Sequence, residues 1–330
     1  DYASLRAEQA KRRASGDVKQ LGIGVSVYVE ITGGVGNGES AKVEVLDDGS
    51  AKVYTGTSPH GQGHDTAWSM LVQEQTGIPM DRIQLVWGDT DLVPIGTGTM
   101  GSRSLQQGGN AVFQVAGTLA EKAKSVAARL LEANEADVVL DKERGVFHVA
   151  GTPSLTKTWA DLAVAEKANG GLSHDDVINV SGATFPFGAH VAVVEVDIET
   201  GKVKHLRQVA CDDAGKVLNP MLLDGQIHGG VAQGVAQALY EEVLYDADGN
   251  PTTSNLADYG FPSAAELPSV EVGHHRLHTC TAERRGRCGV ASRCAPHRDA
   301  LHRRARVGRH PERPLNVIGG YHPSQVASFG

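Results

Sequence analysis

The stretch GTGTMG, residues 96–101, decides the fold class, because it matches the dinucleotide fingerprint G-x-G-x-x-G letter for letter. That fingerprint requires a buried strand that ends at the first glycine and a helix that opens at the last. The candidate strand, residues 83–87, ends too early and is followed by the loop GDTDLVPI. Beyond the stretch, Gly108 and Gly109 discourage a helix before about Asn110. The sequence therefore argues against a Rossmann unit, and the glycines need another explanation.

Hydrophobic periodicity on both sides of this stretch predicts an α+β fold, with mixed sheets, hairpins and packed helices. The turn sequences DDGS, KERG and ETGK each join two strand-like runs. Strands are predicted over residues 22–32, 42–46, 51–55, 138–140, 146–149, 190–198 and 203–210, and helices over 65–76, 110–133 and 221–241. The last helix contains Gly225, Gly229, Gly230 and Gly234, which we expect to face close backbone contacts.

Composition limits the class of protein. A chain of 330 residues can form one large or two medium domains with a proper core. Hydrophobic residues make up 40% of it, and no run approaches the roughly 18 apolar residues of a membrane span. The first residues do not resemble a secretory signal, and Cys211 is the only cysteine before residue 274, which indicates a reducing compartment such as the cytoplasm.

Charge divides the chain into two predicted parts, a domain over residues 1–273 and an aberrant tail over 274–330. The net charge is −8, yet the tail holds 11 of the 19 arginines and none of the 12 lysines. One alternative is a zinc site from Cys280, Cys288, Cys294 and His297, but these lack closely spaced cysteine pairs. Another is a basic arm for nucleic acid or an acidic partner. We favour a reading frame shifted near Gly273, which would leave the tail without a packed fold.

Three polar segments flanked by glycines carry the chemistry of the body. They are GTSPHGQGHDTAW (56–68), GTGTMGSRS (96–104) and LNPMLLDGQIHGGVAQG (218–234). Gln62 and Gln226 each offer a donor and an acceptor, and Arg103 between two serines suits a phosphate. Each segment alone could be a surface turn, but three together favour a ligand site. His60, His64 and His228 lack the spacing of a metal site and are predicted to be hydrogen-bonding partners.

In order and spacing these segments, with VACDDAGKVLNPMLLDGQIHGGVAQGVAQALYEE, resemble the second molybdopterin-binding region of the xanthine oxidase family over about residues 5–273. The similarity is greatest to its carbon monoxide dehydrogenase and bacterial aldehyde oxidase branch. The resemblance implies an oxidoreductase component that binds molybdenum as molybdopterin cytosine dinucleotide. It also implies transfer of water-derived oxygen to CO, an aldehyde or an N-heterocycle. Expected partners are an iron–sulfur small subunit and an FAD medium subunit in a dimer of heterotrimers, with no role for nucleic acid.

The resemblance also implies which residues contact the cofactor. Matched position by position, they are Gly61, Gln62, Gly63, Gly101, Ser102, Arg103, Ser104, Asp213 of the D-x-G motif, and Gln226. No residue is expected to bind the metal directly.

Two parts of the family pattern are missing from the sequence. The first cofactor-binding half of the subunit would precede residue 1, and the motif with the base glutamate should follow Gly273, where Glu283 matches nothing. We therefore assign no catalytic residue, and we expect the chain alone to be inactive and to bind no cofactor stably. The rival hypothesis is a non-catalytic binding module whose basic tail engages nucleic acid or an acidic partner.

Overall fold

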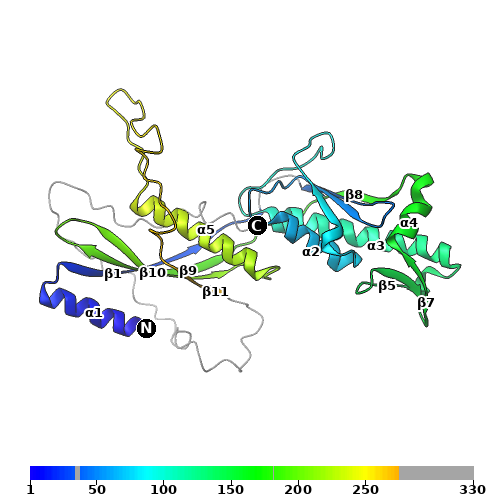
Figure 1. Ribbon diagram of the computed structural model, residues 1–330, viewed down its shortest axis with the longest axis horizontal. Coiled ribbons are helices and arrows are strands. Elements are labelled where there is room, and N and C mark those ends of the chain that lie inside the picture. Colours follow the sequence, from blue (N-terminus) through cyan, green and yellow to red (C-terminus); the bar gives the residue numbers. More distant parts are fainter. Residues whose placement is uncertain (34–37, 181, 275–330) are drawn as a thin grey trace.

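The computed structural model describes residues 1–33, 38–180 and 182–274, which form two lobes side by side (Figure 1). Its helices are α1 (Tyr2–Ser15), α2 (His64–Thr76), α3 (Asn110–Leu131), α4 (Trp159–Glu166) and α5 (Pro220–Leu239). Its strands are β1 (Lys19–Val29), β2 (Glu39–Val45), β3 (Ala51–Thr55), β4 (Ile83–Val86), β5 (Val138–Asp141), β6 (Val146–Val149), β7 (Thr152–Thr158), β8 (Leu172–Ile178), β9 (Phe187–Asp197), β10 (Val203–Asp213) and β11 (Val270–His274).

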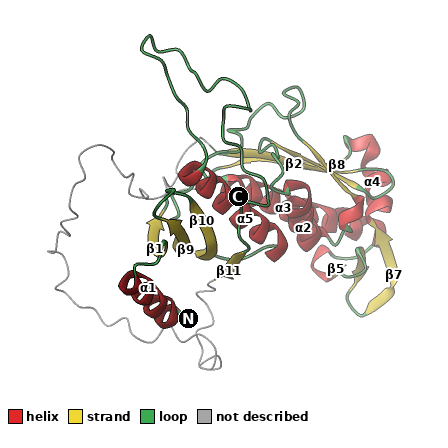
Figure 2. Cartoon of the chain, turned by 60° about the vertical axis from the view of Figure 1, so that its left-hand side comes forward, coloured by secondary structure: helices red, strands yellow, loops and turns green. Residues whose placement is uncertain are grey.

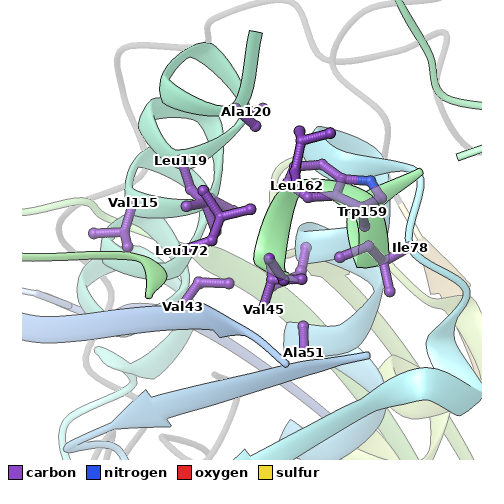
Figure 3. Close-up of a cluster of buried hydrophobic side chains, with 14 of the residues drawn as sticks. Val43, Val45, Ala51, Ile78, Val115, Leu119, Ala120, Trp159, Leu162 and Leu172 are labelled. Carbon is purple, nitrogen blue, oxygen red and sulfur yellow. The ribbon is translucent and has the colours of Figure 1, made fainter. Parts of the chain in front are cut away.

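The α3 lobe, residues 38–178, is built on a sheet in the order β4-β3-β2-β8. β3 and β4 are parallel neighbours joined through α2, whereas β2 pairs antiparallel with both β3 and β8. α3 packs on this sheet with Val112, Val115 and Leu119, all almost fully buried, because their spacing of three and four residues puts them on one helix face. Figure 3 shows part of the resulting core, in which α3 side chains meet those of β2.

A smaller sheet, β5-β6-β7, closes the far end of the α3 lobe together with α4. Phe147 meets Trp159 edge to face, with ring centroids 4.9 Å apart. The indole of Trp159 donates to the Thr76 carbonyl at 2.9 Å, so α4 is fixed to the end of α2. The first turn of α4 is held by a capping box between Thr158 and Asp161.

The α5 lobe is a four-stranded sheet in the order β1-β9-β10-β11, with β1 at an edge. α5 packs on one face, where Ala210, Ile227, Val231 and Val235 form a small core. α1 lies on the opposite side of this sheet, as Figure 1 shows. In Figures 1 and 2 the segment between α5 and β11 extends well away from both sheets.

The α+β prediction is confirmed, and each strand and helix predicted for the body has a counterpart within a few residues. α1 was not predicted from the sequence, because among its residues only Gln9 is buried and an apolar stripe is lacking. β7, β8, β11 and α4 were not predicted either. Within residues 1–33, 38–180 and 182–274, none of the helices combines the length and the apolar character of a membrane span.

The expectations about glycine are met in part. α3 begins at Asn110, as predicted, although Gly108 and Gly109 belong to a turn of π-helix, Ser104–Gly109, that runs directly into it. A β-carbon on Gly108 would lie 2.6 Å from the Thr57 methyl group, so the glycine permits close packing there. In α5, β-carbons on Gly225 and Gly229 would meet nothing within 4 Å, so these two glycines do not face tight contacts. The predictions for residues 275–330 lie outside the described residues.

Candidate functional site

The first two glycine-rich segments lie at the same edge of the α3-lobe sheet. Residues 56–63 connect the end of β3 to α2, and residues 87–103 connect the end of β4 to the π-helical turn before α3. Because β3 and β4 are parallel neighbours, both loops leave the sheet at the carboxyl ends of the strands, the edge where open α/β sheets bind ligands. A β-carbon on Gly96 would lie 2.5 Å from the Gly56 Cα atom. The first glycine of the fingerprint is thus explained by contact between the two loops.

The loop before α2 is ordered by its own side chains. Gly61 and Gly63 have φ values of 104° and 84°, in the left-handed region that glycine adopts without strain. Gln62 Nε2 lies 3.1 Å from His64 Nε2, and His64 Nδ1 lies 2.9 Å from the Thr57 carbonyl oxygen. His64 is therefore a hydrogen-bonding partner, as predicted. α2 begins without a side-chain cap, so its first backbone N–H groups remain suited to an anion.

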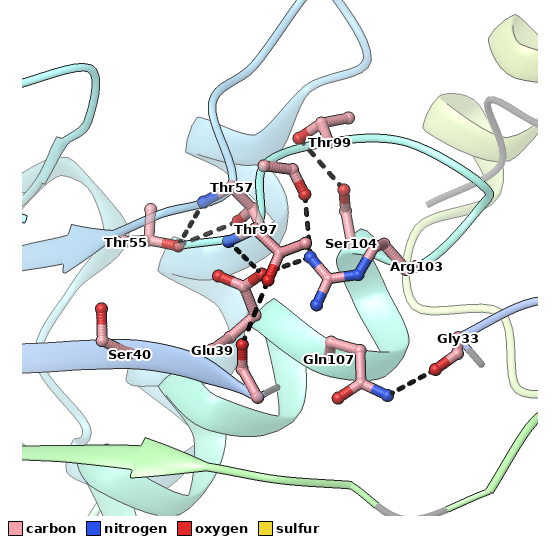
Figure 4. A network of polar contacts seen from close by, with 12 residues as sticks. Gly33, Glu39, Ser40, Thr55, Thr57, Thr97, Thr99, Arg103, Ser104 and Gln107 are labelled. Atoms are coloured by element: carbon pink, nitrogen blue, oxygen red, sulfur yellow. Dashed lines mark hydrogen bonds and ion pairs between the residues drawn. The ribbon is translucent and has the colours of Figure 1, made fainter. Parts of the chain in front are cut away.

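The loop after β4 is held from behind by a buried ion pair (Figure 4). Arg103, 1% exposed, pairs through Nη1 with the carboxylate of Glu39, which is fully buried. The same nitrogen donates to the Gly98 carbonyl at 2.9 Å, and the Thr97 amide donates to Glu39 at 2.9 Å. The guanidinium of Arg103 thus fixes the loop to the start of β2 and does not line either pocket described below.

The serines beside Arg103 differ in their surroundings. Ser104 is buried, and its hydroxyl donates to Thr99 Oγ1 at 3.1 Å. Ser102 has a φ of 51°, which is unusual for a residue other than glycine, and its hydroxyl donates to Glu30 at 3.3 Å. Burial raises the pKa of the Glu30 carboxyl, and the hydrogen bond from Ser102 partly opposes that rise.

The third segment comes from the α5 lobe. Asp213 ends β10 and is 8% exposed, and it accepts a hydrogen bond of 2.9 Å from the Gly215 amide. Asn219 then caps α5 by accepting from the amides of Met221 and Leu222 at 3.0 and 3.2 Å. This cap fixes the start of the helix that carries Gln226.

Two adjoining pockets bring the three segments together. The first, of about 110 Å³, is lined by Gln62 and Gln226 from the two lobes, with His64 and Trp68 behind. The second, of about 390 Å³, is lined by Ser102 and by Asp213. The pockets share part of their wall, formed by Leu105, Ala214, Lys216 and Leu223.

The predicted site residues therefore separate into two groups. Gln62, Ser102, Asp213 and Gln226 line the pockets. The others shape the loops without lining either pocket: Gly61, Gly63, Gly101, Arg103 and Ser104. Among the residues that the structure describes, no cluster of His, Cys, Asp and Glu could hold a metal ion.

A buried network beside the second pocket was not predicted from the sequence. The Tyr28 hydroxyl donates to Asp212 Oδ1 at 2.9 Å, and His190 Nε2 lies 2.9 Å from the same oxygen. Burial, reinforced by the Asp212 charge, raises the pKa of Tyr28. A β-carbon on Gly188 would lie 2.2 Å from Asp212 Oδ1, so the network depends on a glycine there. In the sequence, the adjacent acids Asp212 and Asp213 could have indicated a polar cluster here. Tyr28 and His190 could not, because nothing distinguishes them from other residues in predicted strands.

Comparisons with known proteins identify the family of the chain. Residues 1–268 match the family model described as the molybdopterin cofactor-binding domain. The chain is 38% identical over 291 residues to the carbon monoxide dehydrogenase large chain of Hydrogenophaga pseudoflava, covering 83% of this chain and 36% of that one. It is 35% identical over 270 residues to the gamma subunit of the 6-hydroxypseudooxynicotine dehydrogenase complex of Paenarthrobacter nicotinovorans. This match covers 80% of this chain and 34% of that subunit.

Solved structures give the same result. A reconstituted CO dehydrogenase from Oligotropha carboxidovorans matches with a TM-score of 0.75 and 34% identity, over 83% of this chain and 36% of that one. Quinoline 2-oxidoreductase from Pseudomonas putida 86 matches with a TM-score of 0.73 and 32% identity, over 83% of this chain and 37% of that one. The chain thus spans little more than a third of the length of these relatives.

Proposed function

The chain belongs to the molybdopterin cofactor-binding domain family of molybdenum oxidoreductases, and we propose that it forms one side of the site for a molybdopterin dinucleotide in a larger enzyme. The observation that carries the proposal is the meeting of three separated sequence segments at two adjoining pockets. A dinucleotide is long enough to need two connected subsites, and the shared wall connects them.

The chemistry of the site fits this ligand. Gln62 and Gln226 present amide donors and acceptors to the first pocket, which suits the heteroatom edge of a pterin ring. β-carbons on Gly61 and Gly101 would meet nothing within 4 Å, so a ligand can approach the backbone there. The uncapped start of α2 and Lys216 in the shared wall favour phosphate groups.

We assign the predicted residues different roles in this site. Gln62, Ser102, Asp213 and Gln226 would contact the cofactor with their side chains, and Gly61, Gly63 and Gly101 would admit it to the backbone. Arg103 and Ser104 would keep the second loop in shape, through Glu39 and Thr99. We assign no catalytic residue to this chain.

The reaction that we propose for the complete enzyme is that of the molybdenum hydroxylases. When bound, the cofactor would supply a molybdenum centre at which oxygen from water is transferred to CO, an aldehyde or an N-heterocycle. Carbon monoxide and quinoline appear in the names of relatives, which supports substrates of this kind. The residues of this chain would bind and orient the cofactor and exclude water from it.

We further propose that the cofactor has the cytosine dinucleotide form, and that electrons pass to an iron–sulfur subunit and an FAD subunit. The relatives named as a large chain and as a gamma subunit of a complex support a multi-subunit enzyme. We propose a dimer of such heterotrimers as the assembly. The single cysteine in residues 1–273 supports a reducing compartment, and we propose the cytoplasm.

The test is to produce the chain together with the rest of a large chain from Hydrogenophaga pseudoflava and to count pterin and molybdenum per complex. We expect close to one of each in the complex, and less than a tenth of that with the double variant Gln62→Ala, Gln226→Ala. Gln114→Ala, an exposed position on α3, is the matched control and should not change the count. Full loading of the double variant would contradict the proposal.

A further inference from the structure

Half of one face of the α5-lobe sheet is apolar and bare. Strand register places Val25, Val191 and Val209 in one row across β1, β9 and β10. The next row on the same face is Val27, Ala189 and Cys211, and the third is Val29, Phe187 and the buried Asp213. Residues paired across strands share a face, so these three rows form one surface, which we call the bare face.

The bare face is exposed to an extent unusual for β-branched residues in a sheet. Val25, Val27 and Val29 are 66%, 77% and 65% exposed, and Phe187 is 48% exposed. Alternation of this kind normally puts polar residues on the solvent side of a strand. A contiguous apolar surface on a folded protein marks a binding surface.

The rest of the same sheet is covered. On the opposite face, α5 buries Ala210 and Val231. Beyond the bare face, at the other end of the same side of the sheet, Leu21 and Val193 are only 4% and 3% exposed. There Gln9 of α1 donates to the Leu21 carbonyl at 2.8 Å. α5 and α1 thus each cover part of the sheet, whereas the valines of β1 on the bare face remain more than 60% exposed.

The outer edge of β1 is also open. Among the described strands β1 pairs only with β9, so its outward N–H and C=O groups have no strand beside them. An edge strand of 11 residues with exposed valines would favour self-association unless another segment covers it.

We propose that the bare face docks the part of a molybdenum-hydroxylase large chain that this chain does not span. The relatives match 83% of this chain but only 36% of their own length, so most of such a large chain lies outside the matched region. The bare face also ends beside the second pocket, whose wall includes Phe185 and Pro186. A polypeptide on this face would therefore reach the edge of the cofactor site. The inference rests on the proposed function.

Cys211 provides a native reporter, because it is exposed and lies in the middle row of the bare face. In a chain with Cys280→Ser, Cys288→Ser and Cys294→Ser, it is the only thiol. Its rate of reaction with a maleimide would be measured on the full chain, alone and with the remainder of the Hydrogenophaga pseudoflava large chain added as a separate polypeptide. The control is Val177→Cys in the same background with Cys211→Ser, since Val177 is 43% exposed on the edge strand β8 of the other sheet.

We expect the added polypeptide to slow labelling of Cys211 at least tenfold and to leave the control thiol unchanged. Val27→Asp should abolish both the protection and the complex seen by size-exclusion chromatography, whereas Val177→Asp should abolish neither. Failure of the two polypeptides to associate, or association that leaves Cys211 fully reactive, would overturn the inference.

Other occupants give different results, and each would also overturn it. A second copy would slow labelling of the chain alone as its concentration rises. The chain's own residues 275–330 would be the occupant if a chain ending at His274 labelled faster than the full chain. Failure of this inference is separable from failure of the proposed function: a complex that protects Cys211 but holds no pterin would sink the function alone.

Discussion

The two lobes bury their apolar residues very differently. The α3 lobe has a continuous core that runs from β2 across α3 to Phe147 and Trp159 of the small sheet. Among the described residues of the α5 lobe, the buried cluster under α5 is small, comprising Ala210, Ile227, Val231 and Val235, and three valines of β1 are more than 60% exposed. The α3 lobe thus has an extensive core of its own, whereas the α5 lobe leaves apolar surface that we propose another polypeptide covers. The cofactor site that we propose lies where the two meet.

Breaking the buried ion pair of the α3 lobe should have the largest effect. Glu39→Ala leaves Arg103 buried without its carboxylate, and removing one partner of such a pair costs roughly 3–5 kcal/mol. Urea unfolding monitored by circular dichroism measures this loss. The double variant Glu39→Ala, Arg103→Met should recover part of the lost stability. If Glu39→Ala is as stable as the exposed control Glu74→Ala, the ion pair does not hold the loop.

Truncating the core of the α3 lobe should cost nearly as much. Leu119 is fully buried on α3, and Leu119→Ala should lower the free energy of unfolding by about 2–5 kcal/mol. The matched change on the bare face, Val27→Ala, should stay within about 0.5 kcal/mol in the isolated chain. Equal losses at the two positions would mean that the lobes do not differ in the way described.

A smaller effect is expected at the network beside the second pocket. Gly188→Ala places a methyl group against Asp212 and Tyr28, and such overpacking costs about 1–3 kcal/mol. The hydrogen bond between the Tyr28 hydroxyl and Asp212 should be lost, which would bring the tyrosine pKa back toward its ordinary value. Absorbance titration of the phenolate checks this, and Gly24→Ala is the control, because a β-carbon on this glycine of β1 would meet nothing within 4 Å.

The smallest effect depends on pH. Burial raises the pKa of Glu30 in the folded chain above the unfolded value of about 4.3. The carboxyl is therefore protonated without penalty at low pH, and its ionisation destabilises the folded state as pH rises from about 4.3 through the raised pKa. Glu30→Gln should thus gain stability relative to the parent between pH 4 and pH 7. Thermal unfolding at both pH values tests this, and a constant difference would contradict it.

Most of the fold could be predicted from the sequence where apolar residues repeat at helix or strand spacing, as in α3 and the β2–β3 hairpin. α1 could not, because its contact with the sheet uses Gln9 and Arg12 in place of an apolar stripe. The π-helical turn before α3 was not predicted, because the low helix propensity of glycine argues against a helix at Gly108 and Gly109. The tight packing against Thr57, which requires a glycine at position 108, cannot be inferred from the sequence.

The candidate site was predictable in part, for a related reason. Glutamines next to glycines stand out in a sequence, so Gln62 and Gln226 could be selected from the sequence as candidates for the same ligand site. The burial of Arg103 against Glu39 could not be foreseen, because the two residues are far apart in the chain and either could have faced solvent. Tyr28 and His190 likewise meet Asp212 only through strand register.

Hydrogen exchange can show whether the three segments act as one site. Exchange would be followed by mass spectrometry in the complex with the rest of a large chain, with and without bound cofactor. On loading, exchange in residues 60–64, 101–105 and 213–226 should slow together, while exchange in α1 and in the β5-β6-β7 sheet should stay unchanged. Protection of one segment alone, or of none, would contradict a single site.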